Sequence, residues 1–130
     1  MILKATRESL EELAADKDIP MQGGVWYGAC RAKKLDAWNY FVFCRGVTTK
    51  SSNKVDMQTT YKVSVIHEDY IPEGYVQKVI AKLEAQSLSC AGAKLKATSD
   101  PIDYNYVFKG NTDVVVEIAT ITFVHPEKRC

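Results

Sequence analysis

The sequence has few of the residues from which active sites are usually built. It contains two histidines, His67 and His125, and neither lies in an HExxH, HxH or Cys-His arrangement that would hold a metal ion. The serines also lack the glycine context of a nucleophile elbow: Ser51, Ser52, Ser87 and Ser89. We therefore predict no metal, no cofactor and no enzymatic activity. A cysteine nucleophile that meets a distant histidine in the folded chain stays an open alternative.

Closely spaced cysteines are absent as well. The four cysteines are widely separated, at Cys30, Cys44, Cys90 and Cys130. Such spacing favours reduced thiols over a disulfide framework. The first 15 residues are amphipathic and acidic, unlike a secretory signal. We therefore expect synthesis and folding in the cytoplasm.

Long hydrophobic runs and a large net charge are missing too. No apolar run approaches the roughly 18 to 20 residues that a membrane helix needs, so we expect no integral membrane protein. The formal net charge of +1 provides no general field that would attract nucleic acid or an anionic membrane. A contact with DNA would therefore have to come from a local patch.

The sequence does have the composition of an ordinary globular domain. Its 130 residues, 46% hydrophobic and 25% charged, suit one core and are too few for two, so a single domain is predicted over residues 1–130. Residues 57–85 are central to this domain. Tyr61, Val63 and Val65 alternate with polar residues, which predicts a half-buried strand, and a proline turn and an amphipathic helix follow.

The remaining segments complete the order α-β-β-β-α-β-β. A first helix is predicted at residues 2–15, and further strands are predicted at 25–31, 40–50, 94–108 and 113–124, with Gly46 at a bulge or bend. The fold class is therefore α+β: an antiparallel sheet of about five strands with two helices packed on one face. Because the last strand is apolar on both faces, we expect a second copy of the chain to shelter part of the other face.

Basic residues gather between residues 31 and 54, a segment that contains six basic residues and one acidic residue, Asp36. The candidate basic patch consists of Arg31, Lys33, Lys34 and Arg45. The candidate loop after it consists of Lys50, Ser51, Ser52, Asn53, Lys54, Val55 and Asp56. A solvated face or an edge strand protected by lysines explains these charges. A surface that touches the DNA backbone is the sharper alternative.

Four features follow one another along the chain: the helix ILKATRESLEELAA, the polar loop KSSNKVD, the proline-opened helix IPEGYVQKVIAKLEA, and a closing hairpin that begins with an aromatic DYNY strand. In order, length and spacing they resemble the tail terminator, or tail-to-head joining, proteins of long-tailed bacteriophages. The resemblance extends over nearly the whole chain.

The resemblance implies a structural, non-enzymatic virion protein. Members of the family form a ring, commonly a hexamer, that caps the finished tail tube, ends tube polymerisation and offers the surface on which the head connector docks. The implied partners are further copies of the chain, the tail tube protein and the head connector or neck protein, with nonspecific contact to DNA in the channel and no membrane. The implied location is the virion tail, after assembly in the cytoplasm of the host bacterium. Residues 50–56 would face the tube or its lumen.

Three other functions stay open. The protein could be another phage neck or head-closure component, which differs only in its partner. It could be a small α+β ligand-binding domain or enzyme with a pocket between helices and sheet and with Tyr61, Tyr104 or Tyr106 as polar anchors. A nonspecific nucleic-acid binder, the third alternative, would show steeply salt-dependent affinity for DNA.

Overall fold

The computed structural model describes residues 2–17, 19–29, 38–50, 57–85, 96–98 and 101–127. This part of the chain forms, in order, α1 (Ile2–Ala14), β1 (Val25–Tyr27), β2 (Tyr40–Lys50), β3 (Met57–Glu68), α2 (Tyr75–Glu84), β4 (Lys96–Ala97), β5 (Asp103–Phe108) and β6 (Val115–Glu127). The predicted α+β fold class is confirmed. The two-residue β4 is an addition to the expected order of elements.

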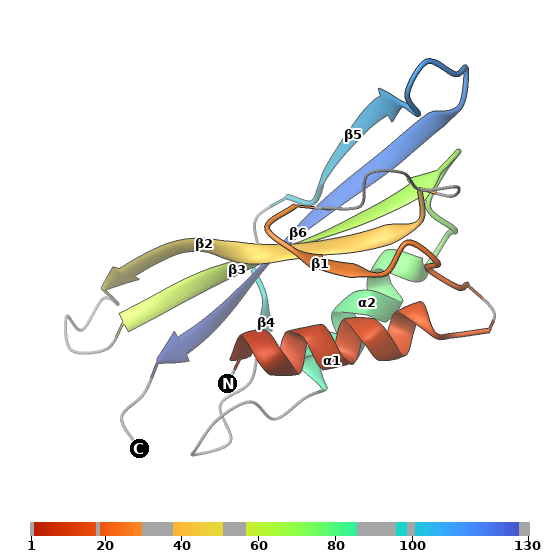
Figure 1. The fold of residues 1–130 in the computed structure, drawn as a ribbon. Coiled ribbons are helices and arrows are strands. Elements are labelled where there is room, and N and C mark those ends of the chain that lie inside the picture. Colours follow the sequence, from red (N-terminus) through yellow and green to blue (C-terminus); the bar gives the residue numbers. More distant parts are fainter. Residues whose placement is uncertain are drawn as a thin grey trace.

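The described strands form one six-stranded sheet of order β1-β2-β3-β6-β4, and β5 also pairs with β6 (Figure 1). The pairs β2 with β3 and β3 with β6 are antiparallel, as predicted. The prediction of an antiparallel sheet is wrong at β1, which runs parallel to β2 with Val25 opposite Phe41. A parallel neighbour needs a connection of about a dozen residues, and the chain between Tyr27 and Tyr40 supplies one.

The single strand predicted at residues 94–108 is divided into β4 and β5, which share one edge of β6. Lys96 lies opposite Val124, whereas Asp103 lies opposite Thr120. More residues separate Lys96 from Asp103 than separate their partners Val124 and Thr120 on β6. One continuous ladder of paired residues therefore cannot include both β4 and β5. Pro101 lies in this interval and has no N–H group for a ladder hydrogen bond. The break separates a short strand near the helices from a longer one beyond them.

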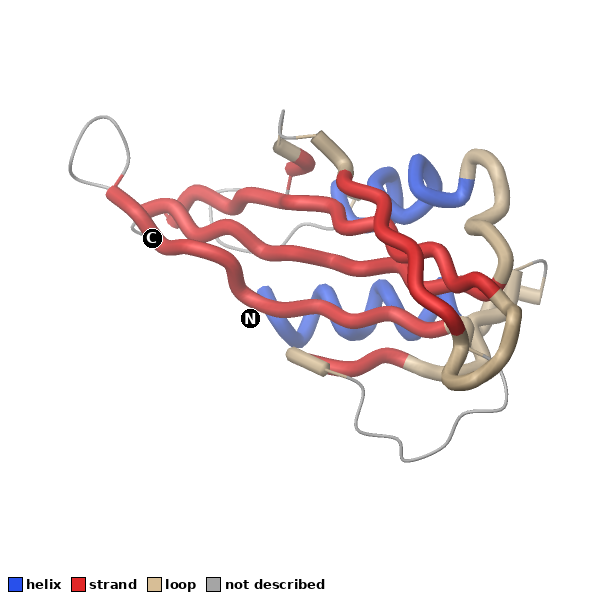
Figure 2. Tube along the Cα trace, turned by 90° about the horizontal axis from the view of Figure 1, so that it is seen from above, coloured by secondary structure: helices blue, strands red, loops and turns tan. Residues whose placement is uncertain are grey.

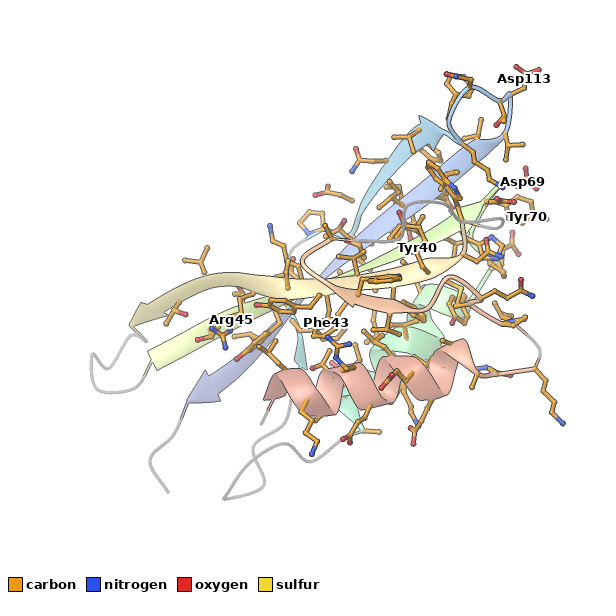
Figure 3. The ribbon with its side chains drawn as sticks, viewed as in Figure 1. Tyr40, Phe43, Arg45, Asp69, Tyr70 and Asp113 are labelled. Atoms are coloured by element: carbon orange, nitrogen blue, oxygen red, sulfur yellow. The ribbon has the colours of Figure 1, made fainter. Side chains whose placement is uncertain are left out.

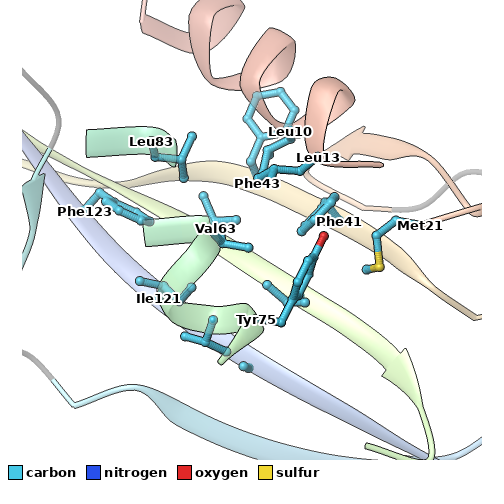
Figure 4. Packing of buried hydrophobic residues seen from close by; sticks show 14 of the residues in the cluster. Leu10, Leu13, Met21, Phe41, Phe43, Val63, Tyr75, Leu83, Ile121 and Phe123 are labelled. Atoms are coloured by element: carbon cyan, nitrogen blue, oxygen red, sulfur yellow. The ribbon is translucent and has the colours of Figure 1, made fainter. Parts of the chain in front are cut away.

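Both helices lie against the same face of the sheet, as predicted (Figure 2). The spacing of Val76, Val79 and Leu83 on α2 buries all three side chains, and α1 contributes Leu10 and Leu13. Odd-numbered positions of the three long strands meet these helices: Phe41, Phe43, Tyr61, Val63, Val65, Ala119, Ile121 and Phe123 (Figure 4). Neither helix is both long and apolar enough to cross a membrane, over the residues described.

The opposite face of the sheet is richer in hydroxyl groups than in exposed apolar groups. Thr60, Ser64 and Thr120 lie there half-buried, and the hydroxyls of Ser64 and Thr120 are 3.3 Å apart across the β3–β6 pair. Of the apolar side chains of β6 on this face, Val116 is buried and Ile118 is half-buried. Most of the exposed large apolar side chains of the described chain lie on β5 and at the start of β6, and of these Val107 is on this face.

Gly46 lies at a bulge in β2, as predicted. The register between β2 and β3 shifts between Arg45 and Thr48. At the bulge the hydroxyl of Thr60 accepts a hydrogen bond of 2.7 Å from the backbone N–H of Val47 and lies 3.3 Å from the Val47 carbonyl. A Cβ atom at position 46 would lie 2.3 Å from that hydroxyl oxygen. The Thr60 hydroxyl, which accepts the hydrogen bond from Val47 at the bulge, therefore fills the space that a side chain at position 46 would need.

We expect Gly46→Ala to lower the free energy of unfolding by about 1 to 3 kcal/mol, the usual cost of overpacking. In a Thr60→Ala background the same substitution should cost less, because the hydroxyl is gone and the next atoms lie 3.3 and 3.4 Å from the new Cβ. Urea unfolding of the four proteins of this double-mutant cycle measures the difference. Equal costs in both backgrounds would show that Thr60 does not exclude the side chain.

A second prediction about stability concerns Tyr75. Its ring stacks on Phe41 at a centroid distance of 6.2 Å, but its buried hydroxyl has no hydrogen-bond partner among the described residues. Tyr75→Phe keeps the ring and removes the unpaired group, so the free energy of unfolding should rise by about 1 kcal/mol. Tyr75→Ala, which removes the ring, should lower it by about 3 to 5 kcal/mol. Thermal unfolding of both variants checks this, and a loss of stability in Tyr75→Phe would contradict it.

Because of Tyr75, the stability of the protein should also depend on pH. Burial, together with the charge of Asp16, raises the pKa of Tyr75 from 10.0 to about 12. The unfolded chain releases this proton near pH 10, so wild-type stability should fall between about pH 10 and pH 12. Tyr75→Phe should show less of this fall when unfolding is measured in urea at pH 9 and pH 11.

Candidate functional site

The structure describes only part of the basic patch and loop that the sequence analysis selected. Arg45 lies on β2 with an exposed side chain. Lys50 ends β2, and its side chain lies outside the described atoms, as do residues 51–56. Arg31, Lys33 and Lys34 also lie outside the described residues. Of the basic patch, the described residues therefore include Arg45 alone.

Arg45 lies at one end of a groove between the first half of α1 and strands β1 and β2. The groove has a volume of about 580 Å³, and its lining residues are Leu3, Lys4, Arg7, Tyr27, Phe43 and Arg45. Three of the six are cationic and none is acidic. We call this set the basic groove. Figure 3 shows Phe43 and Arg45 on the side of β2 that faces α1.

Aromatic rings form the floor of the basic groove. The Tyr27 and Phe43 rings meet edge to face, with centroids 5.2 Å apart and planes at 69°. The guanidinium carbon of Arg7 lies 5.2 Å from the centroid of Phe43, within the range of a cation–π contact. Arg45 also lines an adjoining polar recess of about 240 Å³ with Thr48, Thr59 and Tyr61. This chemistry suits a ligand that carries both negative charge and an aromatic or apolar group.

Sequence reasoning missed Lys4 and Arg7 as members of this site. They lie one helical turn apart on α1, at the spacing that places two side chains on neighbouring positions of one helix face. The spacing could have grouped these two residues with each other. No local sequence pattern connects Lys4 and Arg7 to Arg45, which lies about forty residues later. The three cations come together only because α1 packs over β2.

The second candidate surface is the hairpin formed by residues 103–120, which we call the arm. Every residue of β5 is exposed, although four of its six side chains are aromatic or aliphatic. Phe108 is 65% exposed and Tyr106 is 60% exposed, and Tyr70, just after the end of β3, is 67% exposed. Other exposed apolar side chains of the arm are Tyr104, Val107 and Val115. In Figure 1 the arm extends beyond the helices and lacks their cover.

The arm is held in place by polar contacts near its turn. The Tyr106 hydroxyl donates to Glu117 Oε2 at 2.8 Å, and the backbone N–H of Ile71 donates to the other oxygen of Glu117 at 2.8 Å. The ammonium of Lys109 lies 2.5 Å from Glu68 Oε1. The backbone N–H of Asp69 donates to the Val115 carbonyl at 2.6 Å. These contacts fix the arm to the end of β3 and leave its apolar side chains in solvent.

These contacts also change proton affinities. The hydrogen bond from Tyr106 to Glu117 raises the pKa of Tyr106, because ionisation would place two negative charges side by side. The hydrogen bond from Lys109, followed by the backbone N–H of Trp38, lowers the pKa of Glu68 below 4.5. The arm is therefore joined to the sheet most firmly when Glu68 is ionised and Tyr106 is protonated.

Acidic side chains surround the arm. Asp69, Glu73, Asp103 and Asp113 are all exposed, and none forms an ion pair with another described residue. Asp69 has a positive φ of 65°, a left-handed conformation at the point where the chain leaves β3. Figure 3 shows Asp69, Tyr70 and Asp113 at the opposite end of the molecule from Arg45. Over the described residues, one end is therefore acidic and aromatic, and the basic groove lies toward the other.

The three tyrosines considered as anchors of a ligand pocket are not brought together. Tyr104 lines a recess of about 220 Å³ beside the start of α2, Tyr61 lines the recess next to Arg45, and Tyr106 is exposed on the arm. The space between helices and sheet is occupied by the core (Figure 4). Among the side chains that the structure describes, no three histidine, cysteine, aspartate or glutamate residues lie close enough to hold a metal ion.

Comparison with known proteins adds evidence on the fold. No protein-family model matches the chain, and no curated protein matches it. Solved structures do match, with 26 chains found. One aligns with a TM-score of 0.52 at 12% sequence identity and covers 99% of this chain and 95% of its own. At this identity the likeness shows the fold alone.

The contact between Lys109 and Glu68 predicts a pH dependence. Glu68 has a lowered pKa in the folded protein, so its stabilising contribution is complete above about pH 4.5 and is lost as the pH falls below that value. Lys109→Met should raise the pKa of Glu68 toward 4.5 and reduce this loss. NMR titration of the Glu68 carboxyl carbon and urea unfolding at pH 7 and pH 3 measure both effects. An unchanged Glu68 pKa in Lys109→Met, or an equal change in the exposed control Lys62→Met, would contradict the assignment.

Proposed function

We propose that the protein is the subunit of a tail terminator ring in a long-tailed bacteriophage. In this role it caps the finished tail tube, stops further addition of tube protein and presents the docking surface for the head connector. The proposal joins the resemblance of the sequence to a structural requirement of the folded chain. The single observation that carries it is the arm, whose aromatic side chains are exposed in the isolated subunit.

The arm supports a subunit of an assembly because of its composition. Tyrosine, phenylalanine and arginine are enriched at protein interfaces, and contiguous exposed apolar side chains on a soluble protein commonly mark a contact surface. The contacts near the turn of the arm hold these side chains in a fixed position before any partner arrives. A prearranged surface loses less conformational entropy on association than a flexible segment does.

The basic residues have a place in the same proposal. A ring at the end of a tail surrounds a channel through which DNA passes, and cations at that channel interact with phosphates without reading sequence. Residues 50–56 are the proposed contact with the tube or its lumen, with Lys50 and Lys54 as the cations. Normal tail length and normal DNA passage in a Lys50→Glu, Lys54→Glu virion would count against this part of the proposal.

The proposed function predicts a ring and an effect on tails. Light scattering of the purified chain over a concentration series, with negative-stain imaging, should detect rings of about six copies. Added during polymerisation of the tube protein, the chain should stop tube growth, and it should bind at one end of each tube. The measurements are the solution mass, the distribution of tube lengths and the position of the bound ring.

Two outcomes would decide against the proposal. A strict monomer that also fails to bind purified tube ends would exclude a terminator ring. A ring that binds the head connector but neither binds nor stops tubes would instead indicate a head-closure component. Heat-unfolded protein is the control for nonspecific effects on polymerisation.

A further inference from the structure

The two ends of the subunit have complementary chemistry. The basic groove presents Lys4, Arg7 and Arg45 around the Tyr27 and Phe43 rings. The arm presents apolar side chains, with Asp103 at its start and Asp113 in its turn, both exposed. The cation of the arm, Lys109, is already paired with Glu68. The groove therefore has positive charge and aromatic surface, and the arm has negative charge and aromatic surface.

We propose that the arm of one copy binds in the basic groove of the next copy. Phe108 is the anchor, because it is the most exposed large apolar side chain of the arm and has no hydrogen-bonding group of its own. The groove volume of about 580 Å³ lies in the range of small-ligand sites and is large enough for a phenylalanine side chain. Asp113, in the turn that follows Phe108, then lies near the groove cations. The inference rests on the proposed ring and names the contact that builds it.

Charge decides between this contact and its symmetric alternatives. An arm against a second arm would bring Asp103, Asp113 and their copies together, and a groove against a second groove would bring six cations together. Juxtaposed like charges cost several kcal/mol at an interface. The arm in the groove places opposite charges together and is therefore the favoured arrangement.

The positions of the two surfaces agree with a ring. The arm and the basic groove lie at opposite ends of the sheet (Figures 1 and 3). A contact between two different surfaces of the same chain is heterologous, and each added subunit offers the same two surfaces again. Such a contact closes into a ring when the rotation per subunit divides a full turn. Tyr27, half-buried at the groove and held edge to face against the buried Phe43 ring, provides the aromatic side chain that receives Phe108.

Two single variants and two matched controls test the contact. Phe108→Lys removes the anchor and places a cation against the basic groove, whereas Asn105→Lys places the same cation on the opposite face of β5. Arg45→Glu places an acid in the groove, whereas Lys62→Glu reverses an exposed cation on the other face of the sheet. Each test variant should weaken self-association by about a hundredfold or more, and each control should remain close to wild type. Circular dichroism confirms that all four fold.

Mixing the two test variants gives the decisive result. Arg45→Glu keeps an intact arm, and Phe108→Lys keeps an intact groove, so one competent contact can form between them. The mixture should therefore contain one-to-one heterodimers and no rings, as measured by native mass spectrometry. A mixture of folded variants that stays monomeric would overturn the inference. Full rings from either variant alone would overturn it as well.

The outcomes separate this inference from the proposed function. If the wild type forms rings that cap tubes and both test variants do the same, the ring stands and the arm-in-groove contact is wrong. If the wild type is monomeric in solution but assembles on tube ends, the four variants are compared for capping, with loss expected for Phe108→Lys and Arg45→Glu alone. If the wild type neither assembles nor binds tubes, both proposals fail.

Discussion

The antiparallel ladder between β3 and β6 determines where the other elements lie. It pairs the two longest strands without a break, from Met57 opposite Glu127 to Glu68 opposite Val116. Because the register is constant, the odd positions of both strands stay on the helix face and build the core with Phe41 and Phe43 of β2. The ladder is longer than the surface that two short helices cover. The end of the ladder at the start of β6 therefore projects past the helices, and the arm forms there.

The sequence indicated the parts of the fold that depend on local pattern. Alternation around Val63 predicted β3, the spacing of Val76 and Val79 predicted α2, and Gly46 indicated the bulge, because each signal lies within one segment. The parallel pairing of β1 and the division between β4 and β5 could not be read this way. Both depend on which strand edge is free once β3 and β6 have paired, and alternation within a segment carries no information on that choice.

The candidate surfaces were less predictable than the core for the same reason. Counting charges along the chain led to the segment around Arg45, but Lys4 and Arg7 join it only through the packing of α1 over β2. The aromatic stripe of β5 was visible in the sequence, where it resembled a core strand. Whether such a stripe is covered depends on how far the helices reach, and here they end before it. Exposure of Phe108 is thus a property of the tertiary structure.

β5 is the edge of the sheet at the arm, and the backbone groups along its outer side face solvent within the described chain. A flat edge with apolar side chains would invite unlimited strand addition and aggregation. Here β5 is short, Asp103 stands at one end, and Lys109 follows at the other. Charges at both ends of a six-residue edge oppose further strands of the same kind. The arm can therefore display an apolar surface on its two faces without offering a long free edge for strand addition.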